Sequence, residues 1–184
     1  RPVADLTRAF EIAPDHADPQ LPADYNMAPT KQAPVVLTRA SKLDDGSRGE
    51  PTRQLRHLTW GLVPSWSKDT KVGLRMINAR AESVLTKPAF RAAIRSRRCL
   101  VPADGYYEWR VLPDGASPAG SAGAPARRGK VPKQPYWIAP GDGRSAAFAG
   151  LYEFWRDPAV AAGDDPDAWL TTFTIITTSA DPGM

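Results

Sequence analysis

Cysteine is almost absent from this sequence, which has a single one, Cys99, among its 184 residues. A disulfide within the chain is therefore excluded, and a reducing, cytoplasmic setting fits this usage best. Long apolar runs are missing too, because no stretch approaches the roughly 18 residues of a membrane-spanning helix. The first residues, RPVADLTRAFE, lack the apolar core of a signal peptide. The sequence therefore predicts no membrane partner.

Histidine is also scarce, and the two present, His16 and His57, have no metal-ligand spacing. The sequence contains no phosphate-binding glycine loop, nucleophile elbow or zinc pattern. Cys99 lies in the apolar run CLVP, where a small buried thiol is expected rather than a nucleophile. We therefore expect no metal and no small-molecule cofactor.

The remaining composition is that of an ordinary soluble protein, with 42% hydrophobic and 24% charged residues. The length predicts one globular domain over residues 1–184, and we expect a monomer. The formal net charge of +4 mildly favours a polyanionic partner such as nucleic acid, although modest positive charge is common on proteins that bind nothing acidic.

Hydrophobic periodicity and turn residues predict a mixture of strands and short helices. The first half should hold a helix in PVADLTRAFEI, a strand ending near Arg39, a polar connection over 40–54, a strand in LRHLTWGLVPSW, and helices at 79–85 and 88–97. The second half should hold strands on both sides of Asp104-Gly105, a mobile Gly/Ala/Pro-rich loop at 113–134, paired strands PYWIAP and AAFAGLYEFW, and a final strand in WLTTFTIITTSA.

Glu108 lies between Tyr107 and Trp109, where an acid is costly to bury. If the two rings remove water from the carboxylate, they favour the protonated acid that a general acid or proton shuttle needs near neutral pH. Strand alternation alone favours the alternative, in which Glu108 points to water and the rings pack inward. Glu153, in GLYEFW, has the same ambiguity.

Asn78 lies in MINARAES, just before the expected helix. Taken alone, it fits a helix N-cap, but its amide could also orient a substrate oxygen because it both donates and accepts hydrogen bonds. Arginines crowd the same region and suit either phosphate binding or a solvated helix face; they are Arg75, Arg80, Arg91, Arg95, Arg97 and Arg98. Trp60 and Trp66 could stack on unpaired bases, although burial is the commoner fate of tryptophan.

Seven segments together resemble the SRAP family, the SOS-response-associated peptidases or abasic-site processing proteins. They are YNMAPT, WGLVPSW, INARAES, RCLVPADGYYEW, QPYWI, FAGLYE and FTIITTSAD. The resemblance covers almost the whole chain, and INARAES followed by CLVPADGYYEW is its most specific part. It implies a single α+β domain with a curved, mostly antiparallel, barrel-like sheet, surrounding helices and a positively charged channel.

The resemblance also implies a protein that recognises abasic sites in single-stranded DNA, shields them through a covalent link, and catalyses β-elimination (lyase) or reversal of the link. In the family, the amine of an N-terminal cysteine attacks the sugar aldehyde, and its thiol closes a thiazolidine. Removal of the initiator methionine exposes that cysteine. The expected location is the cytoplasm, at the nucleoid.

By motif, Asn78 matches the asparagine that contacts the abasic sugar, Glu108 the glutamate that assists proton transfer, and Thr177 an active-site threonine. This overturns the local preference for a cap at Asn78 and a solvent-facing Glu108. Four further residues match the DNA-binding groove: Asn26, Pro29, Arg80 and, with Ser67 as an alternative match, Trp66.

Two departures from the family pattern matter. The chain begins RPVADL, where the family's Met-Cys-Gly-Arg should already have passed, and a family histidine should follow about ten residues after Thr177. We therefore expect a chain shortened at both ends that forms no thiazolidine by itself. Two rival functions are a peptidase acting on other proteins and a passive single-strand binding module.

Overall fold

A computed structural model describes residues 1–113, 131–160 and 165–179. The chain divides into two compact units, one made of residues 1–102 and 147–184 and the other of residues 103–146. Below they are called the barrel unit and the hairpin unit. No helix within the described residues is both long and apolar enough to cross a membrane.

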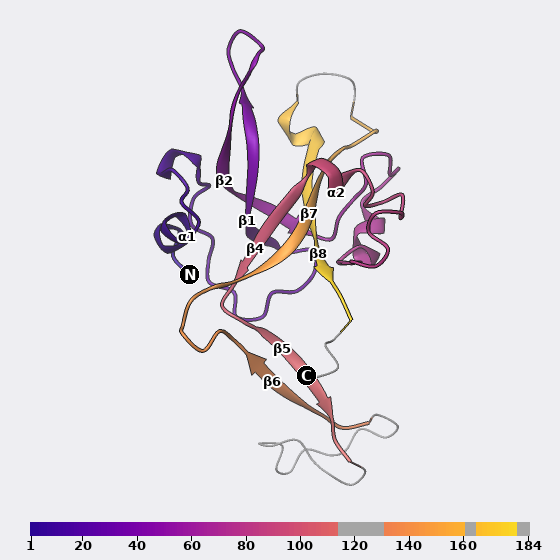
Figure 1. Cartoon of the computed structure of the whole chain (residues 1–184). Coiled ribbons are helices and arrows are strands. Elements are labelled where there is room, and N and C mark those ends of the chain that lie inside the picture. Colours follow the sequence, from indigo (N-terminus) through magenta and orange to yellow (C-terminus); the bar gives the residue numbers. More distant parts are fainter. Residues whose placement is uncertain (114–130, 161–164, 180–184) are drawn as a thin grey trace. The chain divides into compact units, whose positions relative to one another are not determined.

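The barrel unit holds most of the regular structure (Figure 1). Its helices are α1 (Val3–Ala9), α2 (Ala93–Ser96) and the short 3₁₀ turns η1 (Pro14–His16), η2 (Lys71–Arg75) and η3 (Pro166–Ala168). Its strands are β1 (Gln32–Lys42), β2 (Arg48–Trp60), β3 (Asn78–Arg80), β4 (Arg98–Ala103), β7 (Ala146–Arg156) and β8 (Trp169–Thr177).

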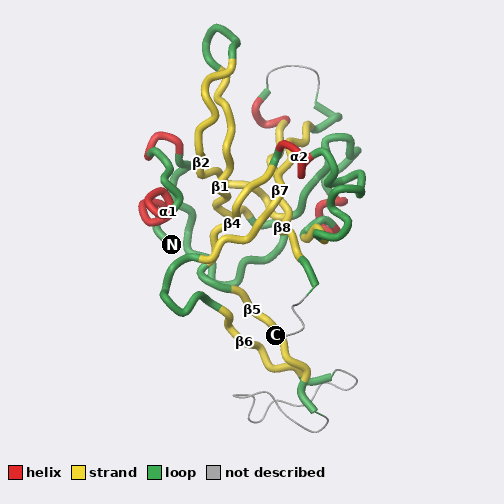
Figure 2. The backbone as a smooth tube through the Cα atoms, in the orientation of Figure 1, coloured by secondary structure: helices red, strands yellow, loops and turns green. Residues whose placement is uncertain are grey.

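Five of these strands close into a barrel. The sheet order is β2-β1-β4-β7-β8-β3, and an additional pairing joins β2 to β8. The pairs β1–β2, β1–β4 and β7–β8 are antiparallel, whereas β8 runs parallel to both β2 and β3. The tube in Figure 2 shows this curved sheet with short helices and loops beside it. The predicted α+β class with a curved, barrel-like sheet is confirmed.

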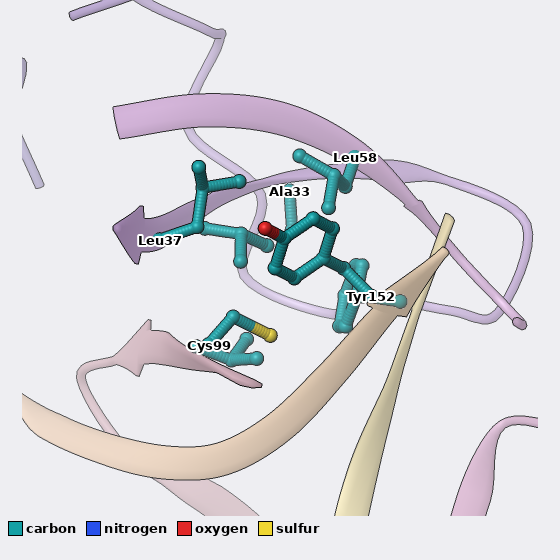
Figure 3. Close-up of a cluster of buried hydrophobic side chains, with 8 residues drawn as sticks. Ala33, Leu37, Leu58, Cys99 and Tyr152 are labelled. Carbon is teal, nitrogen blue, oxygen red and sulfur yellow. The ribbon is translucent and has the colours of Figure 1, made fainter. Parts of the chain in front are cut away.

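The barrel interior is filled by a cluster of apolar side chains that alternate along the strands. Figure 3 shows Tyr152 of β7 pointing toward Leu37 and Leu58, with Cys99 close by. The buried members are Ala33, Val35, Leu37, Leu58, Cys99, Val101, Tyr152 and Phe173. Because alternate residues face outward, the other side of the sheet packs a second cluster: Leu62, Ala79, Val84, Phe90, Ala93 and Leu151.

The β1–β2 hairpin is longer than the sequence predicts. Its register runs from Gln32–Thr59 to Lys42–Arg48, so the turn between the strands covers only residues 43–47. The polar connection predicted at 40–54 is wrong, because most of its residues belong to the strands. Polar residues are tolerated there since this end of the hairpin extends past the barrel and is largely exposed (Figure 1).

The helix expected in PVADLTRAFEI is confirmed as α1, which buries Leu6 against β1 and β2. The helix predicted at 79–85 is wrong, since residues 78–80 form β3 and residues 81–86 form turns. Of the helix predicted at 88–97, only α2 is α-helical. For residues 78–80 the physical reason is the pairing of β3 with β8, which gives their backbone groups partners outside their own segment.

The hairpin unit consists of β5 (Tyr106–Val111) and β6 (Lys133–Ile138), which pair antiparallel. The predicted pairing of PYWIAP with AAFAGLYEFW is wrong, because β6 pairs with β5 and β7 pairs with β8. Lys133 and Gln134, assigned to the predicted loop, belong to β6. Most of that loop, residues 114–130, lies outside the described residues.

Candidate functional site

Three of the predicted site residues share one face where β3 meets β8. The parallel register pairs Asn78 with Ile175 and Arg80 with Thr177, and paired residues of neighbouring strands point to the same side of a sheet. Between them, Ala79 points to the other side and is fully buried in the second cluster. The structure thus brings Asn78, Arg80 and Thr177 together, with Asn78 and Arg80 exposed.

This placement replaces the N-cap interpretation of Asn78, which is wrong because the residue begins a strand. Ile175, the strand partner of Asn78, packs against the core of the barrel. The face that carries Asn78 therefore continues the inner face of the barrel to the end at which β8 stops. The exposed amide of Asn78 and guanidinium of Arg80, with the half-buried hydroxyl of Thr177 beside them, can together donate and accept hydrogen bonds to a polar ligand.

Trp60, the last residue of β2, supports this end of the barrel. Its ring stacks on Phe173 with centroids 6.4 Å apart, and its indole N–H donates to the carbonyl of Ile77 at 2.8 Å. Gly61 follows at φ +124°, and a side chain there would collide with the Gly73 carbonyl. Trp60 is half-buried and committed to these contacts, so it is a support rather than the stacking surface considered above.

The loop that carries Asn26 and Pro29 is attached to the same tryptophan. The N–H of Thr30 donates to the Trp60 carbonyl at 2.8 Å, and the Trp60 N–H donates to the carbonyl of Lys31 at 3.0 Å. Because Trp60 also contacts Ile77, this loop and Asn78 are anchored through one residue. Of the predicted groove residues, Asn26 and Pro29 thus belong to a loop that is bonded to Trp60, which in turn contacts Ile77, the neighbour of Asn78.

Asp24 orders this loop from within. Its carboxylate accepts hydrogen bonds from Lys31 Nζ at 2.7 Å and from the N–H of Asn26 at 2.9 Å. The bond from Lys31 and then the one from Asn26 hold the pKa of Asp24 below its ordinary value. The loop therefore carries an ionised aspartate paired with a lysine, and the Asn26 side chain is exposed beside it.

Glu82 belongs to this site although sequence reasoning missed it. Its carboxylate accepts bonds from the Thr178 hydroxyl at 3.2 Å, the Ser179 N–H at 3.1 Å and the Ser179 hydroxyl at 3.4 Å. Its own N–H, then the Ser179 N–H, the Thr178 hydroxyl and the Arg80 charge lower its pKa. In the sequence, the only indication of a role for Glu82 is its position two residues after Arg80 in INARAES. Its hydrogen-bond partners become visible only in the fold.

Trp66 is anchored elsewhere. It is 65% exposed on a turn whose next residue, Ser67, accepts a hydrogen bond from the Trp155 indole at 2.8 Å. Trp155 pairs with Leu170 near the start of β8, and seven residues of strand, roughly 23 Å, separate Leu170 from Thr177. No described contact joins Trp66 to the face that carries Asn78.

Glu108 lies in the hairpin unit, on β5 opposite Tyr136. Its side chain is exposed. Tyr107 and Trp109 lie on the other face of the strand, where their ring centroids are 6.4 Å apart and Tyr107 lies 5.0 Å from Trp137. The expectation that these two rings enclose the carboxylate is wrong for the hairpin itself, because alternation places them on the opposite side.

The arginine-rich segment divides between surface and core. Arg91, Arg95 and Arg98 are exposed, but Arg97 bonds to Glu153 at 2.7 Å. Glu153 is 6% exposed and also accepts the N–H of Phe154 at 3.0 Å. Arg97 therefore compensates a buried charge and is not available to bind phosphate. Glu153 is the structural partner of Arg97 and not a candidate proton shuttle like Glu108.

Cys99 is 6% exposed in the barrel interior. Burial raises the pKa of its thiol to about 12, so the thiol stays protonated at neutral pH. This supports the prediction that Cys99 is not a nucleophile. Within the described ranges, no group of three His, Cys, Asp or Glu side chains is arranged to hold a metal ion.

The whole chain, residues 1–184, matches the family described as SOS response associated peptidase (SRAP). The chain belongs to the SRAP family. It is 36% identical over 180 residues to the abasic site processing protein YoqW of Bacillus subtilis, covering 98% of this chain and 66% of YoqW. It is 29% identical over 199 residues to the abasic site processing protein HMCES of Pongo abelii, covering 96% of this chain and 52% of HMCES.

Solved structures share this fold. A protein from Bacteroides thetaiotaomicron is 29% identical, with a TM-score of 0.55 over 81% of this chain and 50% of its own. A protein from Bordetella bronchiseptica has a TM-score of 0.63 over 97% of this chain and 69% of its own, and at 22% identity it shows the fold alone. The SRAP chain described here thus spans less than two-thirds of the length of the curated relatives named above.

Proposed function

We propose that this SRAP chain processes abasic sites in single-stranded DNA, as part of a protein that links itself covalently to the lesion. The observation that carries the proposal is the register of β3 on β8, which puts the exposed Asn78 and Arg80 on the same face as the half-buried Thr177. The names of the relatives, which are abasic site processing proteins, supply the substrate class. The net charge of +4 is compatible with a DNA partner.

The proposed reaction begins at the amine of an N-terminal cysteine. The amine adds to the ring-opened sugar aldehyde, and loss of water gives an imine. The cysteine sulfur then bonds to the former aldehyde carbon while the imine nitrogen gains a proton, which closes a thiazolidine. An α-amine has an ordinary pKa near 8, so a useful fraction of it is unprotonated in the cell. Removal of the preceding methionine by the protein itself would expose this amine.

The described residues have distinct proposed roles. Asn78 orients the sugar, since its amide donates to and accepts from oxygen. Arg80 binds a flanking phosphate, and Thr177 offers a hydroxyl beside it. Glu108 is proposed to move protons during formation, reversal and associated lyase chemistry. Asn26, Pro29 and Trp66 are proposed to contact the strand.

Two rival functions predict different products. A peptidase acting on other proteins would release fragments of a generic protein substrate. A passive module would bind intact and abasic strands equally and form no covalent product. A small polar ligand such as an abasic sugar could contact Asn78, Arg80 and Thr177 at once, because the three residues share one face. Neither rival function requires that arrangement.

The test is a crosslinking assay on denaturing gels with a single-stranded oligonucleotide that contains one abasic site. The chain is extended with Cys-Gly-Arg before Arg1 and with a relative's C-terminal segment after Met184. We expect a shifted band that disappears when the added cysteine is changed to alanine and falls at least about tenfold in Asn78→Ala. Glu50→Ala, an exposed acid on β2, is the matched control. Absence of a band from every version would overturn the proposal.

A further inference from the structure

The strand pairing that positions Asn78, Arg80 and Thr177 involves few residues, although the relative positions of these side chains depend on it. β3 contains three residues, and its register against β8 consists of three pairs. Parallel pairing is slightly less stable per residue than antiparallel pairing, and short isolated strand pairs are marginal. Contacts beyond the backbone bonds are therefore needed to hold this register.

Two side-chain contacts flank the short ladder. Before Asn78, the Trp60 indole binds the Ile77 carbonyl at 2.8 Å. After Arg80, Glu82 accepts bonds from Thr178 and Ser179, the two residues that follow β8. The backbone bond between them, from the Ala81 N–H to the Thr177 carbonyl at 2.8 Å, lies directly beside the Glu82 contacts.

We propose that Glu82 is a positioning residue that sets the register of β3 on β8 and thereby the placement of Asn78, Arg80 and Thr177. Its carboxylate joins the chain leaving β3 to the chain leaving β8, so a slip of either strand would break these bonds. A slip by one residue would also turn Asn78 and Arg80 to the other face of the sheet. The role in register stands on geometry alone, whereas its consequence for DNA rests on the proposed function.

The charge pattern supports this role. The carboxylate collects two backbone N–H groups, including its own, and lies near enough to Arg80 for that guanidinium to help lower its pKa. An ionised acid with several donors makes stronger hydrogen bonds than a neutral acceptor. Glu82 is exposed, yet these bonds join segments 97 residues apart in the sequence.

The experiment compares Glu82→Ala, Glu82→Gln and the matched control Glu50→Ala in the extended protein. Amide hydrogen exchange reads the register through the Ala81 N–H, which donates to Thr177, and the Ile175 N–H, which donates to Ile77. We expect exchange at Ala81 to rise about tenfold in Glu82→Ala, the loss of roughly one hydrogen bond, while amides in the barrel core are unchanged. Glu82→Gln keeps one acceptor and should lie between, and Glu50→Ala should match the parent.

DNA binding is measured by fluorescence anisotropy with abasic and intact single strands. This measurement tests the proposed function separately from the role of Glu82 in the register. We expect Glu82→Ala to lower the preference for the abasic strand about three- to tenfold, with partial rescue by Glu82→Gln. Unchanged exchange at Ala81 would overturn the role of Glu82 in register. Raised exchange with unchanged preference would overturn its role in placing Asn78. If the parent shows no preference, the proposed function fails, while the exchange data still decide the register.

Discussion

The hairpin unit is a single antiparallel strand pair and the barrel unit combines antiparallel with parallel pairs, but the two units differ most in what covers their strands. In the barrel, Val35, Leu55 and Leu151 are fully buried. In the hairpin, every residue of β5 is exposed, including Tyr107 and Trp109. A two-stranded hairpin is marginally stable alone in water, whereas a closed sheet with a filled interior is not.

This difference shows where side-chain positions are determined by packing. Around Asn78, the burial of Ala79 disfavours a slip of the strand, because a slip would expose the core face, and the proposed role of Glu82 adds to this effect. Around Glu108, the strand pairing sets which residues share a face, and among the described residues of the hairpin unit no buried layer adds to it. The following predictions test that contrast, from the largest expected effect to the smallest.

Alkylation of a thiol should differ most between the two units. Cys99 is buried and its pKa is raised to about 12 from 9.0, which lowers its thiolate fraction about 1000-fold. We expect native Cys99 to react with iodoacetamide at pH 8 at least about 100-fold more slowly than in denaturant. A cysteine moved to the hairpin, as Val111→Cys in a Cys99→Ala background, should react at nearly the same rate in both states. Fast native alkylation of Cys99 would contradict the buried barrel interior.

Truncation of the barrel core should cost the most stability. Phe173 is 1% exposed and stacks on Trp60. Phe173→Ala should lower the free energy of unfolding by about 3–5 kcal/mol, because it removes apolar contacts and leaves a cavity. Urea denaturation followed by circular dichroism measures this loss. A loss of less than about 1 kcal/mol would mean that the barrel is not the main source of stability.

The buried ion pair gives the next effect. Arg97→Met leaves the Glu153 carboxylate buried without its partner, so we expect a loss of about 2–4 kcal/mol at neutral pH. Arg91→Met, at an exposed arginine of the same segment, is the matched control and should change stability by about 0.5 kcal/mol or less. Equal effects of the two substitutions would show that Arg97 has no special role.

Removal of the indole donor at Trp60 should have a smaller and more local effect. Trp60→Phe keeps an aromatic ring against Phe173 but loses the hydrogen bond to Ile77. We expect a loss of about 0.5–1.5 kcal/mol, because the half-buried Ile77 carbonyl keeps the Ile175 N–H but loses the indole donor. Faster amide exchange should appear at Ile175 before it appears in β1. Uniform changes throughout the barrel would argue for general loosening instead.

The smallest effect on stability is expected in the hairpin. Trp109 is 57% exposed, so Trp109→Ala should change the free energy of unfolding by about 0.5 kcal/mol or less. The same denaturation measurement as for Phe173→Ala provides the comparison. A loss comparable to that of a core residue would show that the hairpin contributes to the global fold far more than its exposure indicates.

Local sequence patterns correctly predicted those helices and strands whose hydrophobic periodicity can be recognised within a single segment. Helix α1 and the long strand β8 follow from such patterns, since Leu6 and the β-branched run before Thr177 need no distant partner to be recognised. Residues 79–85 were predicted as a helix because their composition suits one. Pairing of Asn78, Ala79 and Arg80 with β8, about 97 residues away, decided otherwise.

By itself, the sequence determined the SRAP family, the α+β class and the candidate residues, because motifs and periodicity are local properties of the chain. Only the tertiary structure decided which candidates meet. It paired Arg80 with Thr177, gave Glu82 its partners and committed Trp60 to the Ile77 carbonyl. It also placed Tyr107 and Trp109 across the strand from Glu108. The physical reason is that register and burial depend on strands far apart in the chain, and no local pattern specifies their pairing.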